Sequence, residues 1–241
     1  MEIPSAGDRR ICDGIIMRKW LKKIVSFFLV PFTRWYLRKK RNYAYKGIPI
    51  SVFPGVFHPG LFSSTNFILT FLEGKLLKNS TLLELGCGTS LISIVAAKDG
   101  ALVTACDLNL TALKNAEHNI RQNRATVQLI HSNLFDAIEK KTFDWIIINP
   151  PYYAKVVRNE EDLAWHCGED FQYFQKLFST LRDYMHTNTQ VIMVLTLGCE
   201  RDKIFEIAKR HLFVFELIGE KNALFDGKDF LYRITHVNST V

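Results

Sequence analysis

Hydrophobic and polar positions alternate between two periods from about residue 80 onward. Short apolar runs, typical of strands buried on both faces, are followed by segments in which apolar residues recur every three or four positions, as on one face of a helix. The pattern predicts strands at 81–85, 101–106, 126–131, 143–148, 191–196, 213–218 and 229–236, and helices at 90–98, 109–123, 171–185 and 200–211. Strands that alternate with helices form a parallel sheet with helices on both faces.

The last two predicted strands break this alternation, because a turn segment and not a helix joins them. Two strands joined by a short turn pair antiparallel, since a parallel pair needs a long crossover connection. The predicted fold class is therefore α/β, with a mostly parallel seven-stranded sheet that has an antiparallel edge strand.

The first 50 residues carry a different pattern, which predicts an N-terminal basic helical segment. Within 15–30, apolar residues four positions apart share one face of a helix, and most of the lysines and arginines lie on the other. The apolar run at 24–32 is far shorter than the roughly twenty residues that a membrane span needs. A second stretch, TRWYLRKKRNYAY at 33–45, mixes cations with aromatic rings. We therefore divide the chain into a basic amphipathic helical leader at 1–50 and a main domain at 51–241.

Three interpretations of this leader remain open. The first is a helical cap that packs on the main domain and leaves its basic face in solvent. The second is a docking surface for RNA or for an acidic protein, because cations interleaved with aromatic rings suit phosphates and stacked bases. The third, which the pattern favours least, is adsorption to a membrane surface, as basic amphipathic helices do.

The formal net charge of +7 comes from the leader, because residues 1–50 hold twelve Lys and Arg against three Asp and Glu, and residues 51–241 hold nineteen against twenty-one. A basic coat over the whole molecule is excluded, whereas a basic arm is not. Five cysteines without a C-x-x-C pair argue against a disulfide framework or a cysteine zinc site. They fit a reducing compartment, so we expect a cytoplasmic protein. The histidines show no metal-ligand spacing, so no metal site is predicted.

A glycine turn follows the first predicted strand of the sheet, in the segment LLELGCGTS at 82–90. Gly86 and Gly88 would let the backbone approach a ligand closely, and the helix that follows offers free N–H groups. Asp107 ends the next strand. In doubly wound nucleotide sites, an acidic residue at this place accepts hydrogen bonds from ribose hydroxyls. The alternative is that Asp107 only caps the following helix. Leu108 could pack against an adenine ring.

The most specific feature is Asn149-Pro150-Pro151-Tyr152, directly after a buried strand. Two prolines remove two N–H donors and stiffen the backbone, so nearby carbonyls are free to accept hydrogen bonds. The Asn149 amide oxygen is a further acceptor, and Tyr152 supplies a flat face. Convergent acceptors beside a flat ring suit a planar NH2 group, such as a carboxamide or the exocyclic amine of a base.

The series ELGCG, Asp107 and NPPY resembles class I methyltransferases that use S-adenosylmethionine and methylate amino nitrogens. The resemblance covers about residues 50–236 and implies a Rossmann-like methyltransferase fold. It implies that the glycine turn holds the methionine part of the cofactor, that Asp107 binds the ribose, and that the loop after the third strand lies beside the adenine. That family usually has an acidic residue in this loop, where this chain has Asn133, whose side chain can still bond the adenine amine.

The resemblance, with the residue arguments above, gives two sets of candidate site residues. The cofactor set is Glu84, Gly86, Gly88, Asp107, Leu108, Asn133, Leu134 and Asn149. The set that grips the target nitrogen is Asn149, Pro150, Pro151 and Tyr152.

Within the superfamily the chain most resembles the HemK-type branch, which methylates glutamine in translation release factors. The segments PGVFHPGLFSST at 54–65 and AWHCGEDFQYF at 164–174 carry this resemblance, although HPG at 58–60 lacks that branch's acidic residue. It implies a protein glutamine as substrate. The alternatives are the same reaction on a base amine of RNA or DNA, which the basic leader favours, and a cofactor-binding module without catalysis. His58 and His166 are candidate substrate contacts.

Overall fold

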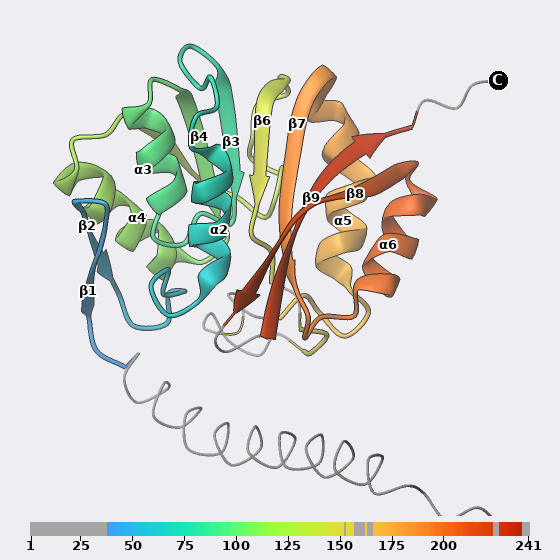
Figure 1. Cartoon of the computed structure of the whole chain (residues 1–241), viewed down its shortest axis with the longest axis horizontal. Coiled ribbons are helices and arrows are strands. Elements are labelled where there is room, and N and C mark those ends of the chain that lie inside the picture. Colours follow the sequence, from blue (N-terminus) through green and yellow to red (C-terminus); the bar gives the residue numbers. More distant parts are fainter. Residues whose placement is uncertain (1–37, 152, 157–161, 163–165, 224–226, 238–241) are drawn as a thin grey trace, which may run out of the picture. The chain divides into compact units, whose positions relative to one another are not determined.

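The computed structural model describes residues 38–151, 153–156, 162, 166–223 and 227–237 (Figure 1). The predicted amphipathic helix and Tyr152 lie outside the described residues. The chain divides into two compact units between Lys40 and Arg41, whereas the sequence analysis placed the boundary at residue 50. The difference arises because the residues from Arg41 onward form a hairpin that bonds to the main domain.

This hairpin pairs strand β1 (Arg41–Tyr45) antiparallel with β2 (Ile48–Val52). Lys46 and Gly47 both have positive φ, as a two-residue hairpin turn of this twist requires. The backbone of Ser51 fastens the hairpin to a helix of the body: its N–H donates to Asn119 Oδ1 at 2.9 Å, and its carbonyl accepts from Asn119 Nδ2 at 2.9 Å and from Asn115 Nδ2 at 2.8 Å. The sequence analysis did not foresee this hairpin.

Seven strands form the main sheet in the order β5-β4-β3-β6-β7-β9-β8. Their bounds are Thr81–Leu85 for β3, Leu102–Asp107 for β4, Val127–His131 for β5, Phe143–Ile148 for β6, Met185–Thr196 for β7, Phe213–Ala223 for β8 and Gly227–His236 for β9. The five strands from β5 to β7 are parallel, and β9 runs antiparallel to both β7 and β8. The predicted fold class, a mostly parallel seven-stranded sheet with antiparallel pairing at one edge, is confirmed.

Helices cover both faces of the sheet (Figure 1). Helices α2 (Ser63–Leu72), α3 (Leu91–Lys98) and α4 (Leu110–Gln122) contribute to one face, and α5 (Gln172–Thr180) and α6 (Arg201–Arg210) to the other. Strand β6 shows why both sides are apolar, because Ile146 and Ile148 pack into the core under α5 and α6 while Ile147 packs into the core under α2 and α3. None of the described helices is long and apolar enough to span a membrane.

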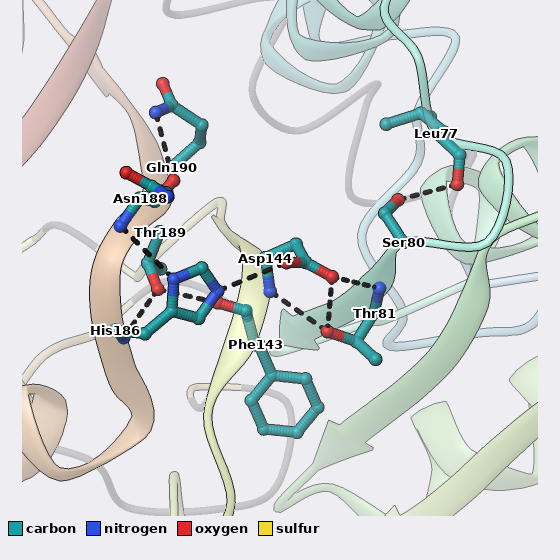
Figure 2. A network of polar contacts seen from close by, with 9 residues as sticks. All are labelled: Leu77, Ser80, Thr81, Phe143, Asp144, His186, Asn188, Thr189 and Gln190. Atoms are coloured by element: carbon teal, nitrogen blue, oxygen red, sulfur yellow. Dashed lines mark hydrogen bonds and ion pairs between the residues drawn. The ribbon is translucent and has the colours of Figure 1, made fainter.

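Strand β7 begins six residues earlier than predicted, at Met185, and a 3-10 turn at Leu181–Tyr184 ends the preceding helix. A polar network holds this extension (Figure 2). Asp144 Oδ2 accepts from the backbone N–H of Thr81 at 2.7 Å and from its hydroxyl at 2.8 Å, and Asp144 Oδ1 lies 3.1 Å from His186 Nε2. Hydrogen bonds from Thr81, with its backbone N–H first, hold the pKa of Asp144 below its ordinary value. The network therefore ties together the starts of β3, β6 and β7.

Candidate active site

A cavity of 510 Å³ opens at the carboxyl ends of the parallel strands, where open α/β sheets bind ligands. The predicted residues that line it are Glu84, Gly86, Gly88, Asp107, Leu108, Asn133, Leu134, Asn149, Pro150 and Pro151. Tyr152 lies outside the described residues. Residues that the sequence analysis placed on four separate strand ends thus meet around one cavity.

The glycine turn after β3 is anchored to the neighbouring strand. The backbone N–H groups of Gly86 and Cys87 both donate to the carbonyl of Cys106 at 2.9 Å. Gly86 has a φ of +74°, which disfavours any residue with a side chain, and the space where its Cβ would lie has no atom within 4 Å. The turn therefore presents bare backbone to an open part of the cavity, which fits a ligand that approaches the main chain.

Glu84 is buried beneath this turn, with 4% of its surface exposed. Its Oε2 accepts from the backbone N–H of Ser93 at 2.9 Å and from the Ser93 hydroxyl. Burial raises the pKa of Glu84 to about 8, although the bonds from Ser93 lower it. Without a bound cation, Glu84 is therefore mostly protonated at pH 7, and a cationic group in the cavity would favour its charged form.

Asp107 joins the glycine turn to the end of β4. Its Oδ2 accepts from the N–H of Gly88 at 2.9 Å, and its Oδ1 accepts from the N–H of Asn109 at 2.9 Å. Burial raises the pKa of this carboxyl, against the lowering effect of these backbone bonds. Each carboxylate oxygen has a second lone pair, so Asp107 can still accept from two ligand hydroxyls. The cap of α4 is Asn109, whose Oδ1 accepts from Thr111 and Ala112, so Asp107 is not that helix's cap.

The loop after β5 forms the next wall of the cavity. Leu134 has a φ of +56°, an unfavourable conformation for a branched residue. The Ser132 hydroxyl stabilises it by donating to the Leu134 carbonyl at 2.8 Å and accepting from the N–H of Ala137 at 3.0 Å. Asn133 and Leu108 both line the cavity, where Asn133 is exposed and Leu108 is 40% exposed. These residues offer an apolar surface with a polar edge, which suits an adenine ring.

Asn149 lies at the end of β6 with its amide held by helix α2. Its Nδ2 donates to Ser64 Oγ at 3.2 Å and to Thr65 Oγ1 at 3.4 Å. Within the described part of the chain, Oδ1 of Asn149 accepts no hydrogen bond. The amide oxygen is therefore an acceptor that a ligand in the cavity can use. Sequence reasoning missed Ser64 and Thr65, although a run of hydroxyl residues at the start of an apolar helix was a signal for them.

The two histidine candidates differ in their positions. His166 lines the cavity, with Nδ1 3.2 Å from the carbonyl of Val156 and 3.6 Å from Asp162 Oδ1. His58 is buried, its ring lies edge-on to Tyr43, and its Nδ1 accepts from the N–H of Gly60 at 3.1 Å. His58 is not among the residues that line the cavity. Of the two, only His166 borders the site.

Solved structures of several methyltransferases share this fold. The structure aligns with the 16S rRNA N2 G1207 methyltransferase of T. Thermophilus, in complex with AdoMet and guanosine, at a TM-score of 0.58 and 17% identity over 81% of this chain and 50% of that chain. It aligns with a methyltransferase from Pyrococcus furiosus at a TM-score of 0.58 and 22% identity, over 80% of this chain and 92% of that one. These likenesses establish a Rossmann-like methyltransferase fold.

Two curated relatives align with parts of the sequence. Ribosomal RNA small subunit methyltransferase C of Buchnera aphidicola is 27% identical over 155 residues, which are 63% of this chain and 41% of the relative. A putative protein N5-glutamine methyltransferase of Methanocaldococcus jannaschii is 37% identical over 108 residues, which are 44% of this chain and 52% of the relative. The chain thus spans about half the length of these two relatives.

The fold and these relatives define the class: the protein is an S-adenosylmethionine-dependent methyltransferase. The family model named methyltransferase small domain matches residues 48–195. The chain belongs to that family, and S-adenosylmethionine is its cofactor.

Proposed function

We propose that the protein transfers the methyl group of S-adenosylmethionine to a planar amino nitrogen, and that this nitrogen is a glutamine amide of a protein. The observation that carries the proposal is the Asn149 amide, whose Nδ2 is held by Ser64 and Thr65 and whose Oδ1 is left to accept from a ligand. A hydrogen-bond acceptor beside two prolines suits an NH2 group, which can donate to it. It does not suit a deprotonated hydroxyl or a carbon nucleophile, which cannot donate.

The residues around the cavity fit the cofactor. Bare backbone at Gly86 and Gly88 would face its methionine part, with the Glu84 carboxyl close to the amino group. Asp107 would accept from the ribose hydroxyls, and Asn133, Leu108 and Leu134 would surround the adenine. When bound, the cofactor supplies a methyl group made electrophilic by a sulfonium.

The chain's own contribution is made at the target nitrogen. The lone pair of an amide nitrogen is delocalised into its carbonyl, which makes it a poor nucleophile. Hydrogen bonds from its two N–H groups to Asn149 Oδ1 and the Pro150 carbonyl would localise that lone pair and hold the nitrogen for attack. Such positioning lowers a barrier by up to about 7–11 kcal/mol in ideal cases. The same acceptors stabilise the positive charge that develops on nitrogen.

The variant Asn149→Ala tests this role. Asn149 belongs to both candidate sets, but its amide oxygen is assigned to the target nitrogen. We therefore expect the affinity for S-adenosylmethionine to stay within about twofold, while turnover falls by about 10²–10³-fold, as on removal of one preorganised polar contact to a developing charge. Calorimetry with the cofactor and a labelled-methyl assay measure the two quantities. Turnover near that of the wild type would refute the proposal.

A base amine of RNA or DNA is the second candidate substrate. The relative named ribosomal RNA small subunit methyltransferase C matches a longer part of this chain than the glutamine methyltransferase does, and the leader sequence is basic. On this alternative the leader would dock nucleic acid. For a glutamine substrate it would instead dock an acidic protein surface.

Digestion of labelled product separates the two candidates. The protein is incubated with methyl-labelled S-adenosylmethionine and a cell extract, and the product is treated with protease or with nuclease. Release of label by protease alone supports the glutamine amide, and release by nuclease alone supports the base amine. If neither the protein nor the nucleic-acid fraction is labelled, the proposed activity is wrong.

A further inference from the structure

Helix α2 begins with three hydroxyl residues in a row, Ser63, Ser64 and Thr65, whose placement is unusual. The residue before them, Phe62, provides no side-chain cap, although serine and threonine commonly occupy that cap position. Ser64 and Thr65 are instead buried inside the first turn, at 2% and 6% exposure. Buried hydroxyls destabilise a fold unless they are hydrogen-bonded, so their partners explain why they are there.

The partners lie on two different strands. Ser64 and Thr65 accept from Asn149 Nδ2, at the end of β6. Ser63, one position earlier, donates through Oγ to Asp229 Oδ2, at the start of β9. Successive residues of a helix point about 100° apart, so one turn can reach both strands. The first turn of α2 thus bridges the end of β6 and the start of β9, across the intervening β7.

Asp229 is an unexpected residue for a simple contact between a helix and a strand. It is 1% exposed, and its Oδ1 has no hydrogen-bond partner within the described residues. It faces Thr196 of β7 across the antiparallel ladder, so both side chains lie on the face of the sheet that α2 covers. A buried carboxylate with a single partner is costly, and apolar residues would pack α2 onto the sheet more favourably.

We propose that Ser64 and Thr65 are positioning residues for Asn149. The contact of Ser63 with Asp229 holds the first turn of α2 in the place from which Ser64 and Thr65 can bond to the Asn149 amide. The inference rests on the proposed role of Asn149 at the target nitrogen. The oxygen and nitrogen of an asparagine amide have nearly the same shape. If the amide rotates, Nδ2 replaces Oδ1 in the cavity and meets the substrate N–H groups donor to donor.

The amide itself can be observed without any substrate. In a 15N-labelled protein, the side-chain NH2 signals of Asn149 are assigned by their loss in Asn149→Asp. We expect slow hydrogen exchange of these protons in the wild type, and exchange at least about tenfold faster in Ser64→Ala/Thr65→Val, because two acceptors are removed. Ser63→Ala should give a smaller increase. Thr70→Ala, at an exposed position on the same helix where the hydroxyl donates to the Asn66 carbonyl, is the matched control and should change neither the exchange rate nor its pattern.

Turnover gives the second measurement, with the labelled acceptor fraction from the digestion experiment as substrate. We expect the double variant to lose about tenfold or more in kcat, while the dissociation constant of S-adenosylmethionine changes less than twofold. Ser63→Ala should lose several-fold, and Asp229→Asn, which keeps an oxygen to accept from Ser63, should stay close to the wild type. In an Asn149→Asp background, whose two oxygens are equivalent, the Ser64→Ala/Thr65→Val pair should have little further effect.

Several results would overturn the inference. Unchanged exchange of the Asn149 amide in the double variant would show that Ser64 and Thr65 do not hold it. Faster exchange without loss of turnover would show that holding it is irrelevant to catalysis. Equal losses of turnover and cofactor affinity would indicate a structural role alone. Failure of the proposed function is distinct from these, because it would appear as full turnover in Asn149→Ala while the exchange results stay as expected.

Discussion

The carboxyl groups of Glu84 and Asp107, on neighbouring strands, differ in their hydrogen-bond partners and therefore in how readily they change charge. Glu84 is buried and accepts hydrogen bonds from Ser93, and burial raises its pKa to about 8. Asp107 is fixed by backbone N–H groups from Gly88 and Asn109, which oppose the effect of its burial. Glu84 is thus suited to change its charge when a cationic group binds, whereas Asp107 is suited to accept hydrogen bonds from a neutral one.

Glu84 should make the stability of the ligand-free protein depend on pH. Its pKa is higher in the folded chain than in the unfolded chain, so the folded state binds more protons from about pH 4.5 to pH 8, and stability falls as pH rises through that window. Relative to the wild type, the free energy of unfolding of the neutral variant Glu84→Gln should rise by on the order of 3 kcal/mol between pH 5 and pH 8. Urea unfolding at both pH values measures this. Parallel stability curves for the two proteins would contradict it.

Glu84 should also link cofactor binding to protons. If the carboxyl ionises when the cationic amino group of S-adenosylmethionine binds, binding at pH 7 releases protons. Calorimetry in two buffers with different ionisation enthalpies counts these protons. Glu84→Gln should bind more weakly and release none, and an unchanged proton count in that variant would exclude Glu84 as the source.

At the scale of elements, side chains at one end of the sheet stabilise the fold, and those at the other end line the cavity. Asp144 bonds to Thr81 and His186 where the strands start (Figure 2). It also lies at the register shift between β6 and β7, where the regular ladder is interrupted. At the opposite end, the residues after β6 line the cavity. The polar network at the strand starts therefore supports the fold without contributing to the site.

Asp144→Ala should reduce stability without changing the site. The variant removes the acceptors of Thr81 and His186, and we expect a loss of about 1–3 kcal/mol, reduced by the partial exposure of these side chains. The pKa of Asp144 is lowered in the folded protein, so this contribution is present above the ordinary aspartate pKa and is lost as pH falls through the lowered value.

Urea unfolding and cofactor calorimetry measure the two expectations for Asp144→Ala. Asp183→Ala, which removes an exposed ion pair with Lys140 at 3.0 Å, is the control and should leave stability close to that of the wild type, because solvent screens such a pair. A loss of cofactor affinity in Asp144→Ala would contradict the conclusion that the polar network at the strand starts does not contribute to the site.

At the scale of the whole molecule, the catalytic body and the basic leader are separate units. The contacts of the chain divide between Lys40 and Arg41, and the described residues that line the cavity belong to the second unit. Residues 1–40 hold ten Lys and Arg against three Asp and Glu, whereas residues 41–241 hold twenty-one of each, so the net positive charge belongs to the first unit. Binding of the cofactor should therefore depend on the body, and any electrostatic choice of substrate on the leader.

Deletion of residues 1–40 tests this division. The shortened chain keeps the hairpin that Ser51 fastens to α4, so we expect it to unfold cooperatively and to bind S-adenosylmethionine within about threefold of the full chain. If the leader docks nucleic acid, deletion should also reduce the slope of log affinity for a short RNA against log salt, because fewer counterions are released. An unchanged slope would exclude that docking role, and loss of cofactor binding would contradict the division.

The strands that carry the site could be predicted from the sequence because each is decided locally. Strands β3 and β6 have the predicted bounds, since a run such as FDWIII at Phe143–Ile148 is apolar enough to be buried on both faces. Asn109 was expected to cap a helix and does, because a cap needs only its own next three residues. The glycine turn, Asp107 and the Asn149 segment were found because each follows directly on such a strand.

Other features depended on residues distant in the sequence. The hairpin at Arg41–Val52 was missed because β2 ends in three consecutive buried residues, and its contacts with Asn115 and Asn119 of α4 lie far along the chain. Helix α2 was missed because its polar first turn looks like a loop until Asn149 and Asp229 provide partners for its hydroxyls. His58 and His166 were equivalent candidates in the sequence, whereas in the structure His58 packs against Tyr43 and His166 lines the cavity.

The sequence by itself determined the alternating sheet, the methyltransferase motifs and the chemistry that they suit, because those follow from short-range patterns of burial and turn residues. Only the tertiary structure decided which strand ends meet around one cavity, how the Asn149 amide is oriented and where the leader separates from the body. Each of those depends on contacts between segments that lie far apart along the chain, such as the 85 positions between Ser64 and Asn149.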